Sequence, residues 1–569
     1  MNIVRLDNPK KDYAWGSRCS LQTLIGEAPD GQPLAEIWMG AHPASPSRLP
    51  DGRPLSEVDV RERGNLSFLF KFLSAEQALS IQAHPSREQA EEGFAREEEA
   101  GIPMNARERT FRDRNHKPEI IVALEPFQGM SGFRPLEDAL ASLMAAGVLS
   151  PEAAGRDQSA AGGNPGAGAG DESAAGGQPG SAATDESSAG SDPGAVDESA
   201  AGGEVSPVRS LSELLAAVIS LPRSHVESVV SRPPFSEAGA PPEHCPGPVT
   251  EDTRNAWVAE LYRQYGADGS VFAPLFLNLV YLEPGEGLFQ SPGVLHAYLR
   301  GTGVELMAES DNVVRAGLTG KHVDARMLHR IVSFTSEPPR RVLPQPADGD
   351  AETIRLLEGR PQLLVYDTPV ADFRLYRVDF QEAGDAGSAS QAGAEDLEPG
   401  RASEIAGEFE CGTAPCIIAC VSGEVTVAGR QTESEEESGG SDRAQDKREP
   451  ENPGGAPDGY KRRPEDMGAG APGQDSENDP SPIHLTPGQS AFVPASVSRF
   501  QLSGSGGSAF IATAGRSEQT SSVAGNSAQS RVQTSGSPGA VQSRGQTSGP
   551  PGRSQPRGQR SGKPGPSQA

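Results

Sequence analysis

The stretch "LSIQAHPS" (79–86) places three polar side chains at alternate positions of a predicted strand. Because successive strand residues point to opposite faces, Ser80, Gln82 and His84 share one face and the apolar residues between them share the other. A half-buried strand ordinarily presents Val or Leu to the core, whereas this one presents a hydroxyl, an amide and an imidazole. The stretch therefore indicates a polar site inside the fold.

Two further segments supply side chains that could complete a metal site. Glu119 opens the apolar strand "EIIVAL", where an inward carboxylate is costly unless it is paired or metal-bound. His296 lies in the predicted strand "GVLHAYL". With Gln82 and His84 they offer two imidazoles, one carboxylate and one amide oxygen, a set that suits Zn²⁺ and leaves charge to polarise a substrate oxygen. Taken singly, each histidine is more often a hydrogen-bonded core residue, so spacing alone leaves both interpretations open.

The surrounding sequence predicts a mainly β protein with a helical insertion. Short apolar runs predict strands in residues 1–125 and again in 272–319, beginning at "VFAPLFLNLVYL". Helical periodicity is found in 135–150, 207–231 and 251–266. The region 340–514 contains "GEVTVAG" and "LTPGQSAFVPA", alternating runs joined by Gly and Pro turns that are typical of a jelly roll. We therefore expect two related antiparallel barrels, with a helical block inserted in the first.

Composition indicates long disordered segments rather than additional domains. Only 35% of the 569 residues are apolar, and the chain contains 67 Gly and 50 Pro. The segments expected to be disordered are 155–206, 384–407, 431–480 and the tail 515–569. The expected domains are a first barrel from 1–125 and 271–339, a helical domain from 126–270 around the first insert, and a C-terminal barrel from 340–514 around the next two.

Charge and cysteine usage indicate a cytoplasmic protein. The net charge is −28, the inserts are acidic and the tail is basic. Arg/Gly/Ser tails can bind nucleic acid, but no aromatic residue interleaves these arginines, so we expect solvated connectors, no nucleic-acid partner and no membrane partner.

Five cysteines without CxxC spacing indicate reduced thiols, and the first residues lack the apolar run of a signal peptide. We expect a monomer.

Five motifs, in this order, resemble type I mannose-6-phosphate isomerase (phosphomannose isomerase). They are "YAWGS" (13–17), "AEIWMGAHPASPS" (35–47), "LFKFLSAEQALSIQAHPS" (69–86), "NHKPEIIVAL" (115–124) and "GVLHAYLRGTGVELMAESDNVVRAGLTGKHVD" (293–324). The family is a zinc-dependent cupin enzyme that interconverts mannose 6-phosphate and fructose 6-phosphate. The resemblance therefore implies cupin barrels, one Zn²⁺ per chain, a sugar phosphate substrate and a place in mannose metabolism.

The resemblance also implies roles for individual residues. Its metal ligands match Gln82, His84, Glu119 and His296. Its catalytic arginine matches Arg315 in "SDNVVRAGLT", and the lysine of its "HKPE" motif matches Lys117. The chain departs from the family at Ser86, where "HPD" is common, and in its low-complexity inserts.

Moving a carbonyl from C1 to C2 requires a base that carries one proton between neighbouring carbons, through an enediol(ate) whose charge zinc and Arg315 would stabilise. Lys117 is the first candidate base, and Glu305 and His116 are alternatives. A surface ion pair is the alternative interpretation of Lys117.

The substrate phosphate needs cations or hydrogen-bond donors, and Ser80, Lys71 and Arg315 are candidates. Lys71 could instead be a strand residue whose ammonium reaches solvent. Tyr298 is a candidate pocket residue. Two other functions remain open: a cupin that binds zinc and sugar phosphate without catalysis, and an isomerase of another aldose 6-phosphate.

Overall fold

The computed structural model describes residues 2–59, 66–153, 208–347, 353–380, 405–412, 414–429 and 481–515. The segments predicted to be disordered lie almost wholly outside these ranges, so their disorder stays a prediction. One boundary needs correction. Residues 405–407 belong to a strand, whereas the sequence analysis placed them in the insert 384–407.

Eleven strands among the described residues form the first sheet, and every pairing in it is antiparallel. They are β2 (Lys10–Lys11), β3 (Glu36–Met39), β4 (Phe68–Ala75), β5 (Ile81–Ala83), β6 (Glu119–Ala123), β7 (Phe127–Phe133), β8 (Leu277–Leu282), β9 (Gly287–Gln290), β10 (His296–Ala308), β11 (Val314–Gly317) and β12 (Arg340–Val342).

Strand β10 connects the two halves of this sheet. Its first residues lie between β5 and β7, and its later residues lie between β4 and β6. Gly301 marks the change of partners. Its φ is 127°, and a Cβ at this position would come within 2.7 Å of the Phe127 ring, so only glycine fits here. One strand can therefore deliver residues to both walls of the barrel.

The strands β4, β6 and β10 are buried on both faces, and their side chains alternate between two environments. In β4, Phe70 and Phe72 pack in a core shared with the second sheet, whereas Leu69 and Lys71 face a pocket on the other side. This alternation is the period-2 pattern of a strand. It explains how a lysine can occupy the middle of the apolar run "FLFKFL".

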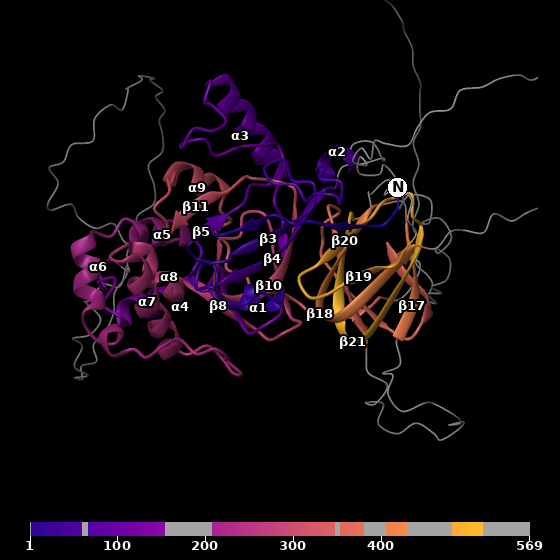
Figure 1. Cartoon of the computed structure of the whole chain (residues 1–569). Helices are drawn as coiled ribbons and strands as arrows, with labels where there is room; N and C mark the ends of the chain where they lie inside the picture. The colour runs from indigo at the N-terminus through magenta and orange to yellow at the C-terminus, as the bar shows by residue number, and fades with distance from the viewer. Residues whose placement is uncertain are drawn as a thin grey trace, which may run out of the picture. The chain divides into compact units, whose positions relative to one another are not determined.

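The described residues contain nine helices and two 3₁₀ turns. They are α1 (Ser20–Leu24), α2 (Leu55–Asp59), α3 (Arg87–Glu99), α4 (Leu136–Ala145), α5 (Leu211–Ile219), α6 (Arg223–Val230), α7 (Glu251–Tyr265), α8 (Ala273–Phe276), α9 (Ala325–Ile331) and the 3₁₀ turns η2 (Phe235–Glu237) and η3 (Gly269–Phe272). Five of the helices, α4 to α8, lie in the insertion between β7 and β8. Helices α4 to α8 gather in one group (Figure 1) and share a core with apolar residues of β5, β7 and β8.

One expectation about these elements was wrong, and one was incomplete. The run "VFAPLF" at 271–276 was predicted as strand, but it forms η3 and α8. Pro274 lies in the first turn of α8, where its missing N–H costs nothing. The first 125 residues were predicted as strand-rich, yet they also contain the 13-residue helix α3.

The second sheet contains ten strands of the described residues. They are β1 (Val4–Leu6), β13 (Gln345–Pro346), β14 (Ile354–Gly359), β15 (Gln362–Tyr366), β16 (Arg374–Phe380), β17 (Ile405–Cys411), β18 (Cys416–Gly429), β19 (Ile483–Leu485), β20 (Ser490–Val493) and β21 (Arg499–Thr513). Strand β1 pairs with β20, with Val4 opposite Phe492. This corrects the assignment of 1–125 to the first barrel, because the first strand of the chain completes the second sheet.

The mainly β fold with two barrels and a helical insertion is confirmed. Among the described residues, no helix is both long enough and apolar enough to cross a membrane.

Candidate active site

Three side chains that could hold a metal ion meet inside the first barrel. His84 follows β5, Glu119 opens β6 and His296 opens β10. Their ligand atoms all lie within 4.8 Å of one another, and each residue is only 1% exposed. His296 Nε2 is 3.0 Å from one Glu119 carboxylate oxygen, and His84 Nε2 is 3.3 Å from the other. Ligand atoms this close together could all bind one metal ion.

The hydrogen bonds of the two imidazoles leave the inward nitrogens free to bind a cation. The Nδ1–H of His84 donates to the carbonyl of Asn312 at 2.8 Å, and that of His296 donates to the carbonyl of Val294 at 2.8 Å. A carbonyl only accepts, so the neutral imidazoles carry their proton on Nδ1 and a lone pair on Nε2. Both Nε2 atoms are buried without a hydrogen-bond partner. The donor set therefore fits Zn²⁺, which imidazole nitrogens and carboxylates bind.

The pKa values of these groups favour the ligand forms. Burial, together with the charge of Lys117, lowers the pKa of His84 to about 4. Burial acts to raise the pKa of Glu119, but the positive charge of Lys117 acts to lower it, and the pKa lies below its ordinary value. A neutral imidazole and an ionised carboxylate are the protonation states that bind metal.

Strand register brings Gln82 and Arg315 beside these ligands. Gln82 is the partner of His296 across β5 and β10, and Arg315 is the partner of Gln82 across β11 and β5. Side chains directly opposite in an antiparallel sheet lie on the same face. The amide of Gln82 and the guanidinium of Arg315 therefore both face the pocket, and both residues line it.

A pocket of about 860 Å³ opens beside the metal ligands. Most of the residues singled out in the sequence line it: Lys71, Ser80, Gln82, Lys117, Glu119, Tyr298, Glu305 and Arg315. The Tyr298 hydroxyl donates to Glu119 at 3.2 Å. The aromatic residues Tyr13, Trp15 and Trp38 line the pocket too. Its size suits a small polar substrate.

Lys71 is neither a solvent-reaching strand residue nor a free cation. Its ammonium lies 3.0 Å from Glu36 and 2.7 Å from Glu305, and it is 7% exposed. Burial opposes its charge, but the two carboxylates raise its pKa above the ordinary value. Trp38 Nε1–H donates to Glu36 at 2.8 Å, which fixes this carboxylate. The charge of Lys71 is already neutralised, so we do not assign it to the phosphate.

His116 points elsewhere. Its Nε2 lies 2.9 Å from an Asp372 carboxylate oxygen, and it is not among the residues that line the pocket. Lys117, the next residue, does line the pocket, and its ammonium is 3.6 Å from Glu119. Lys117 and Glu305 are thus the candidate bases that face the pocket. Burial raises the pKa of Glu305, although Lys71 acts against this shift.

Besides Lys71, Arg109 and Lys117, which pair with carboxylates, four cations line the pocket: Arg107, Arg112, Arg315 and Lys321. Among the described residues, no carboxylate forms an ion pair with any of them. Burial and the charge of Arg112 lower the pKa of Arg315, and burial, Arg315 and Arg112 lower that of Lys321. Like charges held together in this way form a site for an anion.

Arg107, Arg112 and Lys321 were not predicted, because they belong to irregular segments without periodicity. The only available signal was the presence of Lys321 in the motif that resembles the family.

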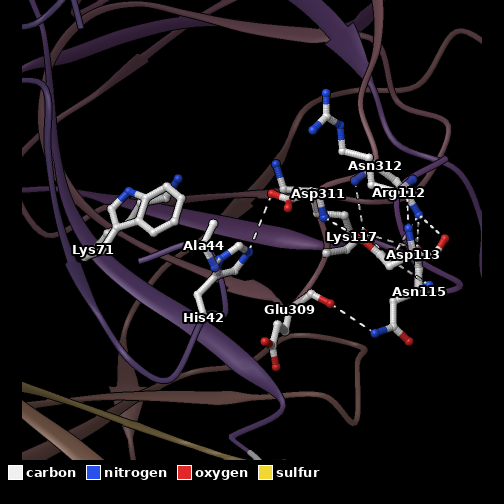
Figure 2. Close-up of polar contacts among 12 residues, drawn as sticks. His42, Ala44, Lys71, Arg112, Asp113, Asn115, Lys117, Glu309, Asp311 and Asn312 are labelled. Carbon is white, nitrogen blue, oxygen red and sulfur yellow. Dashed lines mark hydrogen bonds and ion pairs between the residues drawn. The ribbon is translucent and has the colours of Figure 1, made fainter. Parts of the chain in front are cut away.

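An ion pair connects two loops that border the pocket. His42 Nε2 lies 3.5 Å from Asp311, and both residues line the pocket. The hydrogen bond from His42 holds the pKa of Asp311 below its ordinary value. Figure 2 shows this pair together with the segment 112–117 that brings Arg112 and Lys117 to the site.

Comparisons with known proteins agree on one family. The family model "Phosphomannose isomerase type I, catalytic domain" matches residues 3–136. Over 391 residues the chain is 33% identical to mannose-6-phosphate isomerase of Escherichia coli (strain K12), covering 65% of this chain and 82% of that protein. Over 400 residues it is 31% identical to the Homo sapiens mannose-6-phosphate isomerase, covering 65% and 80%.

Solved structures of such enzymes have the same fold. The structure of mannose 6-phosphate isomerase bound with zinc and yttrium is 26% identical, with a TM-score of 0.57, covering 91% of this chain and 100% of that one. The apo form from Salmonella typhimurium is 27% identical, with a TM-score of 0.58 and the same coverage.

Proposed function

Because the chain belongs to the type I phosphomannose isomerase family, we propose that the pocket beside His84, Glu119 and His296 interconverts mannose 6-phosphate and fructose 6-phosphate. The observation that carries this proposal is the buried triad, whose two unpartnered imidazole nitrogens face one carboxylate. The chain is an aldose–ketose isomerase that uses zinc.

The residues of this chain divide the work between two ends of the pocket. His84, Glu119 and His296 would hold the metal, with the amide oxygen of Gln82 as fourth ligand. Bound zinc supplies a Lewis acid for the oxygens of the reacting carbons. At the other end, Arg112 and Lys321 would bind the phosphate, because they are cations that pair with no carboxylate among the described residues. Ser80 lines the same pocket and offers a hydroxyl.

Arg315 would act between the two ends. Its backbone is paired with Gln82, and its charge contributes to the lowered pKa of Lys321. From this position the guanidinium can stabilise negative charge that develops on the sugar oxygens as the enediolate forms.

Two side chains are placed to carry the proton between the two carbons. Lys117 lies beside Glu119, and Glu305 is a buried carboxyl whose raised pKa makes it more basic than an ordinary glutamate. Lys71 contacts Glu305 and would keep this carboxyl in place. The variants Lys117→Met and Glu305→Gln distinguish these roles. The variant that lacks the base should lose nearly all turnover, and the other variant should lose less.

A coupled assay on the full chain tests the function. Purified protein should convert mannose 6-phosphate to fructose 6-phosphate, a chelator should abolish this activity and Zn²⁺ should restore it. Glucose 6-phosphate in a parallel assay distinguishes an isomerase of another aldose phosphate. Stoichiometric zinc and tight phosphate binding without turnover of any aldose 6-phosphate would instead identify a binding protein.

We also propose that the chain works as a cytoplasmic monomer without a nucleic-acid or membrane partner. The support is the acidic overall charge and the free cysteines of the described residues. Sedimentation velocity of the full chain tests the monomer, since a mass near twice 59.4 kDa would refute it.

A further inference from the structure

Asn312 lies in the turn between β10 and β11 and has no exposed surface. Its side chain is bound entirely to one other segment, residues 112–115. The Oδ1 atom accepts from the backbone N–H of Arg112 at 2.7 Å and of Asp113 at 3.3 Å. The Nδ2 group donates to the carbonyls of Asp113 at 3.0 Å and Asn115 at 2.9 Å, and to the Asp113 carboxylate at 3.1 Å.

This set of contacts uses the full capacity of a primary amide. An asparagine side chain has two donor hydrogens and two acceptor lone pairs. Aspartate has the same shape but cannot donate when ionised, and alanine makes none of these bonds. The position therefore requires an amide, for a reason that is visible in the structure.

The backbone of the same residue holds a metal ligand. The carbonyl of Asn312 accepts the Nδ1–H of His84 at 2.8 Å. This bond sets the tautomer and the ring orientation of His84, so the direction of its Nε2 lone pair depends on where that carbonyl lies. The side chain of Asn312 is what fixes the carbonyl against residues 112–115.

The segment that Asn312 holds leads to both ends of the pocket. Arg112 is one of the unpaired cations of the pocket, and Lys117 follows in the same segment (Figure 2). Glu119 comes two residues after Lys117. Neighbouring contacts support the same junction, since Ser310 Oγ donates to Asp113 at 2.9 Å and Asn115 Nδ2 donates to the carbonyl of Glu309 at 3.0 Å. Asn312 is the residue of this junction that also contacts a metal ligand.

We propose that Asn312 is a positioning residue that orients His84 for zinc and Arg112 for the substrate phosphate. The proposal rests on the proposed function, which assigns the metal to His84 and the phosphate to Arg112. Asn312 touches neither ligand directly, so its effect passes through those two residues. Its loss should weaken both binding events while the fold remains.

The test measures zinc and phosphate binding separately, on the full chain. In Asn312→Ala, zinc affinity from competition with a chromophoric chelator should fall about 10- to 100-fold. Affinity for inorganic phosphate, measured by calorimetry on zinc-loaded protein, should fall as well. Asn312→Asp keeps the volume and the acceptor for Arg112 but loses the donors, so it should lose zinc affinity and retain more phosphate affinity than the alanine variant.

Asn8→Ala is the matched control. Asn8 donates to Ser490 and accepts from Ser47, each at 2.8 Å, so the variant also removes amide hydrogen bonds but none at the site. It should keep both affinities. Unchanged affinities in both Asn312 variants, or equal losses in Asn8→Ala, would overturn the proposal. Neither measurement depends on turnover, so a wild-type protein without isomerase activity would reject the proposed function and not this inference.

Discussion

At the scale of single residues, the site is defined by polar atoms that are buried without a partner. His84 and His296 each place a lone pair toward Glu119, and a carboxylate facing two lone pairs in a dry interior is repulsive. A divalent cation removes that repulsion. The cations Arg112, Arg315 and Lys321 line the same pocket without an ion-pair partner among the described residues, and they call for an anion there. A phosphorylated sugar beside zinc satisfies both.

The first prediction concerns the metal. His84→Ala or His296→Ala should lose zinc, because each variant removes one of four proposed protein ligands. Metal content of purified protein, measured by atomic spectrometry, should be far below one zinc per chain. His225→Ala is a control, because His225 binds only the carbonyl of Val148 among the described contacts and should keep its zinc. Wild-type metal content in both ligand variants would show that the metal lies elsewhere.

The second prediction separates Arg315 from Lys321. Arg315→Ala should lower kcat by about 10²–10³-fold with little change in KM, since the charge it stabilises appears only in the transition state. Arg315→Lys should recover part of this loss. Lys321→Ala should mainly raise KM, because phosphate is bound equally before and during the reaction. Steady-state kinetics checks both, and a rise in KM alone for Arg315→Ala would make Arg315 a phosphate ligand.

The residues of the candidate site could be predicted from the sequence where strand periodicity or a motif restricted their positions. Gln82 and His84 were found because alternation in a strand assigns a face to each residue. Glu119 was a candidate because an inward carboxylate in an apolar strand needs a partner. Each histidine by itself was more often a core residue, so only the resemblance to the family joined the four as ligands, and that assignment stays a prediction. Arg112 and the network of Lys71 with Glu36 and Glu305 depend on contacts between distant segments, which a single sequence does not contain.

At the scale of elements, helix α3 begins at a capping motif that is present in the sequence but did not enter the prediction of this region. Ser86 accepts from the backbone N–H of Gln89 at 3.2 Å, and the Gln89 side chain accepts from the backbone N–H of Ser86 at 2.8 Å. This is a capping box. The departure of Ser86 from the "HPD" common in the family is therefore conservative, because Ser and Asp are both strong N-cap residues.

The third prediction follows from this cap. Ser86→Ala should destabilise the protein by about 1 kcal/mol, and Ser86→Asp should stay within about 0.5 kcal/mol of wild type. Denaturant unfolding monitored by circular dichroism checks both. Glu91→Ala, an exposed position inside the same helix, is the control and should be nearly neutral. An unchanged midpoint in Ser86→Ala would mean that packing alone fixes the start of α3.

The prediction of a strand at "VFAPLF" was wrong for a different reason. A short apolar run has the same pattern in a buried strand and in a buried helix. Its length does not distinguish the two elements when the run is shorter than about two helical turns. Here the run packs against α7 and the core of the helical group, so tertiary contacts selected the helix.

The fourth prediction concerns an ion-pair cluster between the segment before β6 and the segment before β16. Asp372 contacts His116 at 2.9 Å and Arg87 at 3.3 Å. Burial acts to raise the pKa of Asp372, but His116 and Arg87 hold it below the ordinary value. An acid with a lowered folded pKa stabilises the fold above its unfolded pKa, and this contribution disappears as pH falls through the folded pKa.

Asp372→Asn should therefore be less stable than wild type by about 1–2 kcal/mol at pH 7, and the difference should shrink as the pH is lowered below about 4. Urea unfolding over this pH range measures it. Asp367→Asn is the control. Its carboxylate pairs with Arg374, but its side chain is 76% exposed, so the substitution should change little at either pH. A constant difference across the pH range would assign the effect to packing.

At the scale of the whole molecule, the long inserts begin and end where the fold already brings the chain together. The backbone N–H of Val208 donates to the carbonyl of Ala153 at 2.9 Å, which joins the two sides of the first insert. The second lies between β16 and β17, which pair with the same stretch of β21 at Gly507 and Gly504. The third joins β18 to β19, whose paired residues include Val427 and Ile483. Composition located these inserts, but only the structure shows that their ends are already close.

The fifth prediction uses this geometry. Deleting 158–203 leaves a short loop between Ala153 and Val208, both of which are 7% exposed and stay anchored by their mutual hydrogen bond. The removed residues are Gly-, Ala- and acid-rich and offer almost no apolar area to bury. Closing a loop costs only about 0.6 kcal/mol per doubling of its length, so shortening it should leave stability equal or slightly higher.

Melting temperature, kcat and zinc content of the deletion variant, and of a second variant truncated after residue 515, should therefore match those of the full chain. A control deletion that extends to residue 215 also removes Leu211, Leu214 and Leu215, which are buried in the core of the helical group. It should unfold that group, because each lost leucine costs several kcal/mol, about 2–5 by analogy with Leu→Ala substitutions. If the shorter deletion lowered the melting temperature as much as this control, the insert would have to pack onto the fold, and the division of this chain into folded barrels and solvated inserts would be wrong.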